Sequence, residues 1–368
     1  MIPLCEPCIQ GNEMKYVKEC IDTNWVSSAG KFVDQFEIAF AQYLNVTKAV
    51  ATVNGTSALH LALILLGIGP GDEVIVPSLT FIAPVNAIRY VGAEPVFADV
   101  GSNSCVMDAE RLEELVSERT RAILPVHLYG FPVAMEKVMQ IAEKHNLFVI
   151  EDATESLGAV CHGKFAGTIG HIGCFSFNGN KLITTGGGGM LVTNDINLGQ
   201  KAKYLSNQAK SVNENGGFIH SEIGYNYRLP NILAAFGLAQ MENIHQFIKA
   251  KREHANQYTV HLKGLKGLNL FEENEGVQSA YWLYSAFLGP EFPVKRDELI
   301  SCLLESGIET RPFFYPVHRM KPYSECRRSS MENTEYIADH GINFPSSVTL
   351  KEDDILYICN CLKKFYLD

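Results

Sequence analysis

The chain has 368 residues, 46% of them hydrophobic, which is enough for a large core and for more than one domain. Its formal net charge of −10 argues against a nucleic-acid or membrane-surface partner, because both require a clustered positive field. The N-terminus has no basic segment followed by an apolar run, and the longest apolar stretch, 58–68, is too short to cross a bilayer, so we expect a cytoplasmic protein. We expect reduced thiols and no metal, because Cys5-x-x-Cys8 has no second pair of ligands.

The first forty residues include one of the two tryptophans, within a stretch of small and polar residues, 23–31. Such a stretch is compatible with a binding loop that includes Trp25, Ser27 and Lys31. It is equally compatible with an N-terminal arm that Trp25 anchors to the core.

From residue 47 onwards, short apolar runs alternate with segments of helical periodicity. The expected strands are 48–53, 73–77, 94–100, 121–127 and 147–153, and helices are expected from Ser57, up to Ile88, from Asp108 and from Met135. This alternation predicts an α/β fold with a mainly parallel sheet covered by helices on both faces. Ligands of such sheets bind beyond the carboxyl ends of the strands.

The second half of the chain continues this pattern and then changes. The expected elements are strands 173–177 and 189–193, a helix over 195–209, a mobile Asn-, Gly- and Ser-rich loop over 210–223, one long helix from Pro230 to about Lys263, a β-rich segment 280–288, a helix over 296–306, a strand over 309–314 and a last helix from Glu352. We therefore expect a large α/β domain over residues 1–240 and a smaller α+β domain over residues 241–368.

A single lysine, Lys181, lies between a short apolar strand and four consecutive glycines, 186–189. Consecutive glycines are typical of backbone that adopts unusual dihedral angles or closely approaches a bound group. The alternative is a flexible surface loop with a solvated lysine.

Two polar motifs follow apolar strands upstream of this lysine. Thr56 and Ser57 open a helix, where free N–H groups and the positive end of the helix dipole suit a phosphate, although every helix also needs a cap. Asp152 ends the strand 147–153, where a buried carboxylate needs a positive partner; a cap or a salt bridge is the alternative.

Together, these segments resemble the DegT/DnrJ/EryC1/StrS family of pyridoxal-phosphate-dependent sugar aminotransferases, over essentially the whole chain from about Pro3. The resemblance implies a fold-type-I aminotransferase with a seven-stranded type of sheet and pyridoxal 5'-phosphate as cofactor. It also implies the roles of the site residues: Lys181 binds the cofactor covalently and moves the proton, Asp152 holds the ring nitrogen, Phe81 packs on the ring, and the phosphate is held by Thr56, Ser57 and Ser176.

Two further segments match the family, Gly224-Tyr-Asn-Tyr-Arg228 and Arg311-Pro-Phe-Phe-Tyr-Pro-Val-His318. The first implies a homodimer with shared active sites, in which Asn226 reaches the phosphate of the neighbouring subunit; the alternative is a contact within one chain. The resemblance further implies a substrate pocket bordered by Trp25, Ser27, Lys31, Arg228, Tyr315 and His318. On its own, His318 is more typical of a structural histidine.

Two positions depart from the usual family pattern. Glu155 replaces a glutamine or histidine, and beside the cofactor's phenolic oxygen a carboxyl group must be protonated or share that oxygen's proton. Gly187 replaces the glutamate of a Gly-Glu-Gly-Gly run. Both departures resemble the subgroup that acts on 4-keto-6-deoxy acetamido sugars, close to the aminotransferases of the bacillosamine and legionaminic acid pathways.

The resemblance therefore implies transfer of an amino group from L-glutamate to carbon 4 of a nucleotide-linked 4-keto-6-deoxy sugar. We expect a UDP-2-acetamido-4-keto-2,6-dideoxyhexose type of substrate, used for a bacterial surface glycan or nonulosonic acid. The alternatives are a GDP-linked 4-keto sugar of the perosamine type, a 3-keto sugar, and a non-catalytic regulator or scaffold that retains the fold. A dehydratase branch of the family carries histidine at the lysine position, so Lys181 argues against dehydration.

Overall fold

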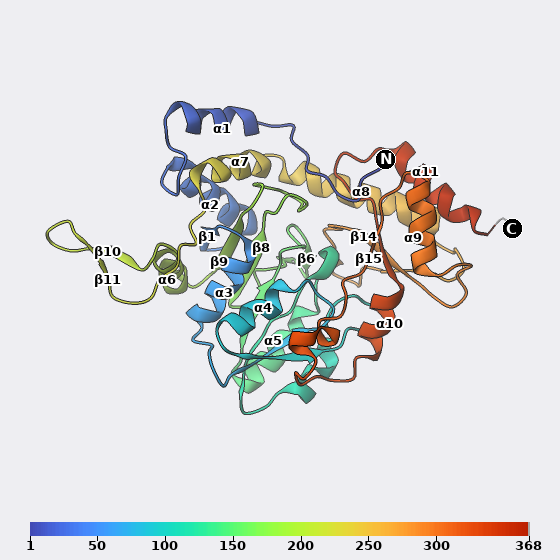
Figure 1. The fold of residues 1–368 in the computed structure, drawn as a ribbon, viewed down its shortest axis with the longest axis horizontal. Helices are drawn as coiled ribbons and strands as arrows, with labels where there is room; N and C mark the ends of the chain where they lie inside the picture. The colour runs from blue at the N-terminus through green and yellow to red at the C-terminus, as the bar shows by residue number, and fades with distance from the viewer. Residues whose placement is uncertain (367–368) are drawn as a thin grey trace.

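The structure, a computed structural model, describes residues 1–366 and is built around a seven-stranded sheet (Figure 1). Its strands, in spatial order, are β1 (Lys48–Thr52), β9 (Gly189–Thr193), β8 (Ile172–Ser176), β5 (Phe148–Asp152), β4 (Thr120–Ile123), β2 (Glu73–Pro77) and β3 (Glu94–Ala98). Only β9 runs antiparallel to its neighbours in this sheet. The expected mainly parallel seven-stranded sheet is confirmed.

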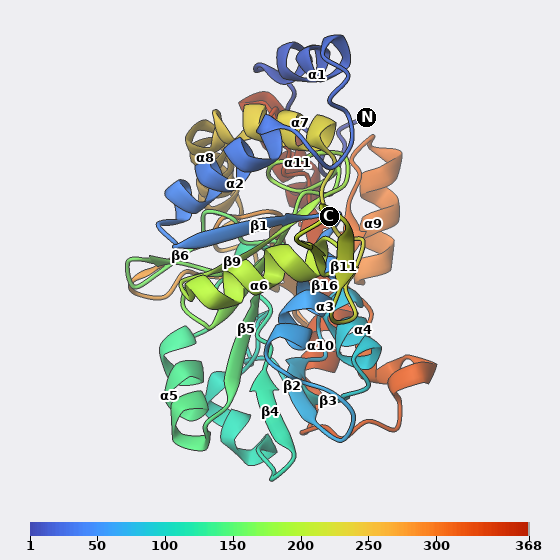
Figure 2. The ribbon, with the colours of Figure 1, turned by 90° about the vertical axis from the view of Figure 1, so that its left-hand side faces the viewer.

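Alternate side chains of the sheet enter two separate hydrophobic cores. In β9, Leu191 belongs to the core that contains α3 (Gly55–Leu65), whereas Met190 and Val192 belong to the core that contains α2 (Lys31–Leu44). This period of two places helices on both faces of the sheet, as Figure 2 shows. Because both faces are covered, the strands are apolar almost throughout.

The remaining helices surround this sheet and a second, smaller one. They are α1 (Glu13–Asp22), α4 (Ala83–Tyr90), α5 (Met135–His145), α6 (Ile196–Ser206), α7 (Asn231–Met241), α8 (Ile244–Leu262), α9 (Arg296–Glu305), α10 (Glu332–His340) and α11 (Glu352–Lys364), with 3-10 turns η1 (Ala109–Leu115), η2 (Leu128–Gly130), η3 (Val317–Arg319) and η4 (Lys321–Tyr323).

The second sheet is antiparallel and packs with α8, α9 and α11 around a third core. Its order is β12 (Leu268–Leu270), β14 (Tyr284–Leu288), β16 (Gly341–Phe344) and β15 (Arg311–Pro312). The N-terminal arm joins this region, since Ile2 pairs with Ile308 and the N–H of Ser346 donates to Leu4 O at 2.8 Å. The arm thus crosses the expected domain boundary near residue 240, which stays a prediction.

A short three-stranded sheet pairs a strand of the C-terminal region with two strands from the first half of the chain. It contains β13 (Val277–Gln278), β6 (Val160–Cys161) and β7 (Lys164–Phe165), all paired antiparallel. Through β13 and β6 it joins segments that are far apart in the sequence.

Three sequence-based expectations about elements were wrong. The expected loop over 210–223 contains a hairpin, β10 (Lys210–Val212) and β11 (Phe218–His220), whose turn is held by Asn213 Oδ1 accepting from two backbone N–H groups. The single long helix is broken between α7 and α8, where the Asn243 side chain donates to Ala239 O in place of a continued helix. The helix expected from Asp108 is a 3-10 helix.

The ten cysteines are free thiols and eight of them are buried. Among residues 1–366, no helix combines the length and the apolar character that a bilayer crossing requires. In the same described part of the chain, no cluster of three or more His, Cys, Asp or Glu side chains has a geometry suited to a metal ion.

Candidate active site

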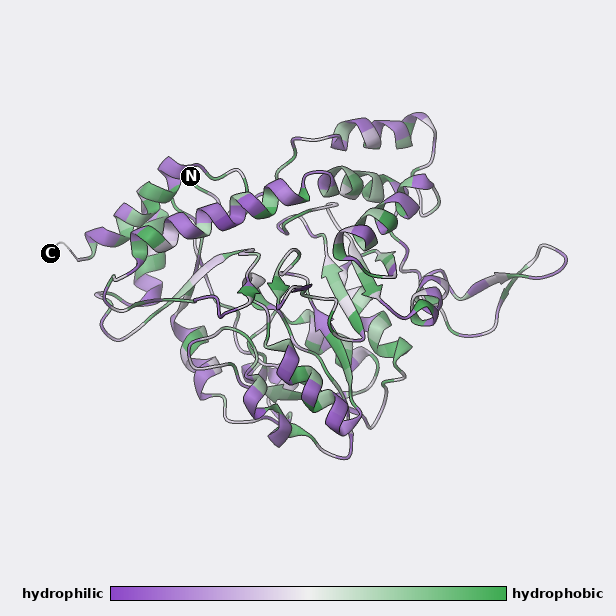
Figure 3. Ribbon diagram, turned by 180° about the vertical axis from the view of Figure 1, so that it is seen from behind, coloured by the Kyte–Doolittle hydropathy of each residue, from purple (hydrophilic) through white to green (hydrophobic). Residues whose placement is uncertain are grey.

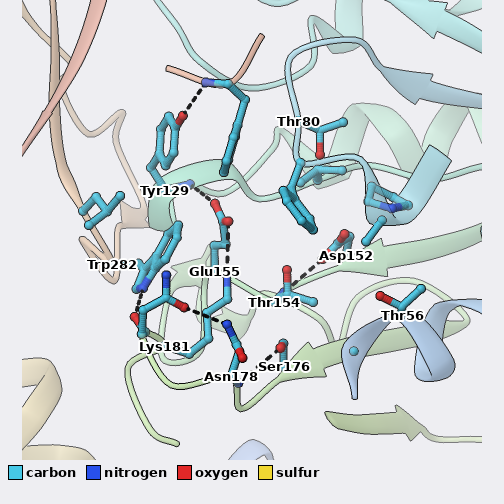
Figure 4. Close-up of a pocket in the computed structure, with 18 of the residues that line it drawn as sticks. Thr56, Thr80, Tyr129, Asp152, Thr154, Glu155, Ser176, Asn178, Lys181 and Trp282 are labelled. Carbon is cyan, nitrogen blue, oxygen red and sulfur yellow. Dashed lines mark hydrogen bonds and ion pairs between the residues drawn. The ribbon is translucent and has the colours of Figure 1, made fainter. Parts of the chain in front are cut away.

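A cavity of about 480 Å³ lies at the carboxyl ends of β5 and β8, between the large sheet and the C-terminal segment (Figure 4). Six of the residues predicted to bind the cofactor line it together: Thr56, Phe81, Asp152, Glu155, Ser176 and Lys181. The position agrees with the rule that ligands bind beyond the carboxyl ends of parallel strands.

Lys181 lies in the turn between β8 and β9 and projects into this cavity. Its Nζ donates to Glu155 Oε1 at 3.1 Å and lies 3.8 Å from the centroid of the Trp282 ring. Its side chain is only 13% exposed. The amine is thus held between a carboxylate and an aromatic face, both of which favour a cation at this point.

Glu155 connects Lys181 to a second element of the cavity wall. Its Oε2 accepts the backbone N–H of Tyr129 at 3.0 Å, and Tyr129 has a left-handed backbone with φ of 53°. Burial raises the pKa of Glu155, and the charge of Lys181 opposes this effect. The carboxylate therefore depends on the lysine for its charge and fixes an unfavourable backbone conformation next to it.

Asp152 is the second buried carboxylate of the cavity. Burial raises its pKa, and the backbone N–H of Thr154, which donates to Oδ1 at 3.1 Å, opposes this effect. A positively charged ligand atom beside this carboxylate would stabilise its ionised form. A protonated pyridine nitrogen has that character.

The glycine run brings the lysine turn against the start of α3. A Cβ added to Gly189 would lie 2.5 Å from backbone atoms of Asn54, so only glycine allows this approach. Gly186 has φ of +79°, a left-handed backbone conformation that favours glycine. At Gly187, by contrast, an added Cβ would meet no atom within 4 Å, and this residue lines the cavity. Glycine at this position therefore leaves the cavity wider without any packing requirement.

The first turn of α3 forms the end of the cavity next to Ser176. The Asn54 side chain caps it by accepting the N–H of Ser57 at 2.8 Å, and Thr56 lines the cavity. The remaining free N–H groups of a first helical turn, together with the hydroxyl groups of Thr56 and Ser176, suit a phosphate. Ser57 is buried beneath this turn and does not line the cavity.

One polar atom on the wall lacks a protein partner. Thr80 is 1% exposed, and its Oγ1 has no hydrogen-bond partner among the described residues. Figure 4 shows Thr80 on the same side of the cavity as Asp152. An unsatisfied buried hydroxyl costs about 1–3 kcal/mol, so a polar ligand atom here would be stabilising. With the exposed Phe81 ring, the helix N-terminus, Asp152 and Lys181, the residues present fit pyridoxal 5'-phosphate.

None of the six residues predicted to border the substrate lines the cavity of a single chain. Trp25 is exposed, Lys31 pairs with Glu19, and Arg228 donates to Asn207 Oδ1 at 3.4 Å. Asn226 pairs with Asn207 in an isolated bridge. The residues placed outside the cavity are Trp25, Ser27, Lys31, Ser57, Asn226, Arg228, Tyr315 and His318.

His318 has a structural position in this chain. Its Nδ1 is 2.7 Å from Ser78 Oγ, its Nε2 is 3.0 Å from Glu335 Oε1, and the side chain is buried. It thereby connects the loop after β2 with α10. Both ring nitrogens are occupied by protein groups within this chain, and the contact of His318 with the sugar stays a prediction.

Several wall residues were missed by the sequence analysis. Tyr129 and Trp282 enclose Lys181 and Glu155, and Asn343 comes from β16, whereas Arg311 of β15 opens the segment 311–318 that was matched to the family. Trp282 Nε1 donates to Asn180 O at 2.7 Å, which fixes its ring beside the lysine turn. The only available signal was the rarity of tryptophan, since the chain has two.

Comparison with known proteins agrees with this site. Residues 7–363 match the DegT/DnrJ/EryC1/StrS aminotransferase family. The chain is 44% identical over 367 residues to the GDP-perosamine synthase of Escherichia coli O157:H7, covering 100% of this chain and 99% of the relative. It is 36% identical over 331 residues to the UDP-N-acetyl-3-dehydro-alpha-D-glucosamine 3-aminotransferase of Acidithiobacillus ferrooxidans, covering 89% of this chain and 87% of the relative.

A solved structure confirms the fold assignment. The crystal structure of the aminotransferase TlmJ from Streptoalloteichus hindustanus matches with a TM-score of 0.94 at 27% identity, covering 100% of this chain and 99% of that chain. The full-length family match and the cavity around Lys181 agree with each other. The chain therefore belongs to the DegT/DnrJ/EryC1/StrS aminotransferase family, as a fold-type-I enzyme that depends on pyridoxal 5'-phosphate and aminates a nucleotide sugar.

Proposed function

We propose that the protein transfers the amino group of L-glutamate to carbon 4 of a GDP-linked 4-keto-6-deoxy sugar of the perosamine type. The observation that carries this proposal is the 44% identity to a GDP-perosamine synthase over the whole of both chains. The expected UDP-linked acetamido sugar has weaker support, because the UDP-sugar aminotransferase compared above is 36% identical. Similarity therefore favours the alternative that the sequence analysis left open.

The side chains of the cavity hold the cofactor, move the proton and exclude water during this amino transfer. Bound pyridoxal phosphate provides an electron sink for charge that develops at the donor α-carbon. Asp152 holds the ring nitrogen in its protonated form, because a carboxylate favours a neighbouring cation. Lys181 holds and moves the proton at this carbon. Proton transfer by a positioned base increases the reaction rate roughly 10²–10⁴-fold. Tyr129 and Trp282 exclude water from the lysine side of the cavity.

We also propose a homodimer in which the neighbouring subunit completes each site. The hairpin β10–β11 projects away from the body of the chain, as Figures 1 and 3 show. The hairpin and the residues just after it leave four apolar side chains largely exposed: Val212, Phe218, Ile219 and Ile223. Asn226 and Arg228 follow directly after this segment and lie outside the cavity of their own chain. A second copy is the partner that accounts for both features.

The substrate assignment is tested with purified enzyme, glutamate and a panel of ketosugars linked to GDP, UDP and dTDP. Mass spectrometry of the nucleotide sugars identifies each aminated product, and Lys181→Ala serves as the inactive control. We expect amination of the GDP-linked 4-keto-6-deoxy sugar in preference to the UDP-linked ones. Preferential amination of a UDP-linked acetamido sugar or of a 3-keto sugar would overturn the proposal.

A further inference from the structure

The charge balance of the cavity calls for a second cationic residue. Within the described chain, its wall contains two positive side chains, Lys181 and Arg311, and two buried carboxylates, Asp152 and Glu155. Lys181 is engaged by Glu155 at 3.1 Å and is the reactive amine. Both substrates of the proposed function carry anionic groups, and the chain has a net charge of −10. Attraction of these substrates must therefore come from local cations, and Arg311 is the one that this chain's own cavity wall offers besides Lys181 among the described residues.

Arg311 lines the cavity and has a largely free guanidinium group. It is the first residue of β15 and pairs with Asn343, which also lines the cavity. Its side chain is 59% exposed and makes one hydrogen bond among the described residues, from Nη2 to Glu309 Oε1 at 2.9 Å. A guanidinium has five N–H donors in a fork that matches carboxylate and phosphate oxygens. Most of this fork is therefore open to a ligand.

Glu309 does not depend on Arg311 for its position. Its Oε2 accepts the backbone N–H of Leu4 in the N-terminal arm at 3.1 Å. This N–H is the main cause that holds the pKa of Glu309 below its ordinary value, and Arg311 adds to the effect. Glu309 is thus an anion held in place beside Arg311 by another segment of the chain. A partly exposed pair of this kind contributes about 0–1 kcal/mol, so an incoming anion can displace it.

We propose that Arg311 is the anion-recognition residue of the cavity and that Glu309 is a built-in competitor, which occupies Arg311 when no anionic ligand is bound. The ligand chemistry is an oxyanion, which is either a carboxylate of the amino donor or the diphosphate of the nucleotide sugar. This proposal rests on the proposed function, because it assumes that these anions enter the cavity. Arg311 recruits the anion, and Glu309 lowers the affinity for it.

The test measures binding to the purified holoenzyme by calorimetry, with glutarate as an amine-free donor analogue and GDP as the diphosphate. A hydrogen-bonded charge is worth about 1.5–3 kcal/mol, so Arg311→Gln should weaken one or both ligands roughly 10- to 100-fold. Glu309→Gln removes the competing charge and should strengthen the same ligand by up to about fivefold. Arg311→Lys, which keeps the charge without the fork, should fall between wild type and Arg311→Gln.

If Arg311 recognises the anion, the two variants change the ligand affinity in opposite directions: Arg311→Gln weakens binding and Glu309→Gln strengthens it. A purely structural ion pair predicts no such opposite effects. Arg319→Gln is the matched control, because Arg319 forms its ion pairs with Asp339 and Glu335 outside the cavity; it should leave both affinities unchanged. An effect on glutarate alone assigns the donor carboxylate, and an effect on GDP alone assigns the diphosphate. Unchanged affinities in Arg311→Gln, or weaker binding in Glu309→Gln, would overturn the proposal. Since no turnover is measured and glutarate carries no nucleotide, the glutarate result is independent of which ketosugar the enzyme aminates.

Discussion

Gly189→Ala tests whether the glycine run exists to bring the lysine turn against α3. The added Cβ would lie 2.5 Å from the backbone C and O atoms of Asn54 and 2.7 Å from Gly55 N. Ordinary contacts begin at 3.4 Å, so the two segments must separate by about 0.9 Å. The atoms in the way belong to the backbone, and no side-chain rotation relieves the clash. The displaced residues form the N-terminus of α3, at the expected phosphate site.

Overpacking of this kind costs about 1–3 kcal/mol, and we expect that loss in the free energy of unfolding. Gly187→Ala is the matched control, because an added Cβ there meets nothing within 4 Å. Both changes remove the same glycine flexibility from the unfolded chain, so the difference between the two variants isolates the contact.

Urea unfolding followed by tryptophan fluorescence gives the stabilities, and absorbance titration with pyridoxal phosphate gives the affinities. We expect Gly189→Ala to be less stable and to bind the cofactor at least tenfold more weakly, while Gly187→Ala stays within about 0.5 kcal/mol of wild type. Equal stability and equal cofactor affinity of the two variants would refute the packing argument.

Three further predictions concern the same site. Burial raises the pKa of Asp152 in the folded state, so its contribution to stability is present at low pH and is lost as pH rises. Asp152→Asn should therefore raise the Tm of the cofactor-free protein at pH 7, and raise it less towards pH 4. The same variant should lose most of its turnover. Thr80→Val should weaken cofactor or substrate binding, whereas Thr334→Val, at an equally unpartnered hydroxyl outside the cavity, should not; equal binding by both variants would remove Thr80 from the site. Mixed subunits of Lys181→Ala and Asn226→Ala should recover roughly a quarter of wild-type activity if sites are shared across a two-fold interface, and none if Asn226 acts within its own chain.

The sequence predicted the parts of the fold that local pattern determines. Strands 73–77 and 189–193 agree with the structure to the residue, because their apolar runs end at turn residues. The break at Asn243 was missed, since the periodicity of α7 continues into α8 and only the side-chain bond to Ala239 O reveals it. The hairpin over 210–220 was missed because its strands have three residues each.

In the candidate site, too, the residues at strand ends could be predicted and those placed by tertiary packing could not. Lys181, Asp152 and Ser176 are adjacent to strand ends of one sheet, so a correct topology brings them together. Trp282 and Asn343 reach the cavity from the C-terminal region, over sequence separations that no local pattern encodes. Where a residue is placed by tertiary packing, single-sequence reasoning had no signal for it.

The claim that Lys181 is the reaction centre is tested most directly by borohydride reduction of the holoenzyme, followed by peptide mass spectrometry. The geometry around its Nζ, with Glu155 at 3.1 Å and Trp282 at 3.8 Å, places one lysine in the cavity of each chain within the described residues. We predict that the reduced cofactor is found on the peptide that contains Lys181 and on no other. Stoichiometric labelling of a different lysine would contradict the assignment of the active site.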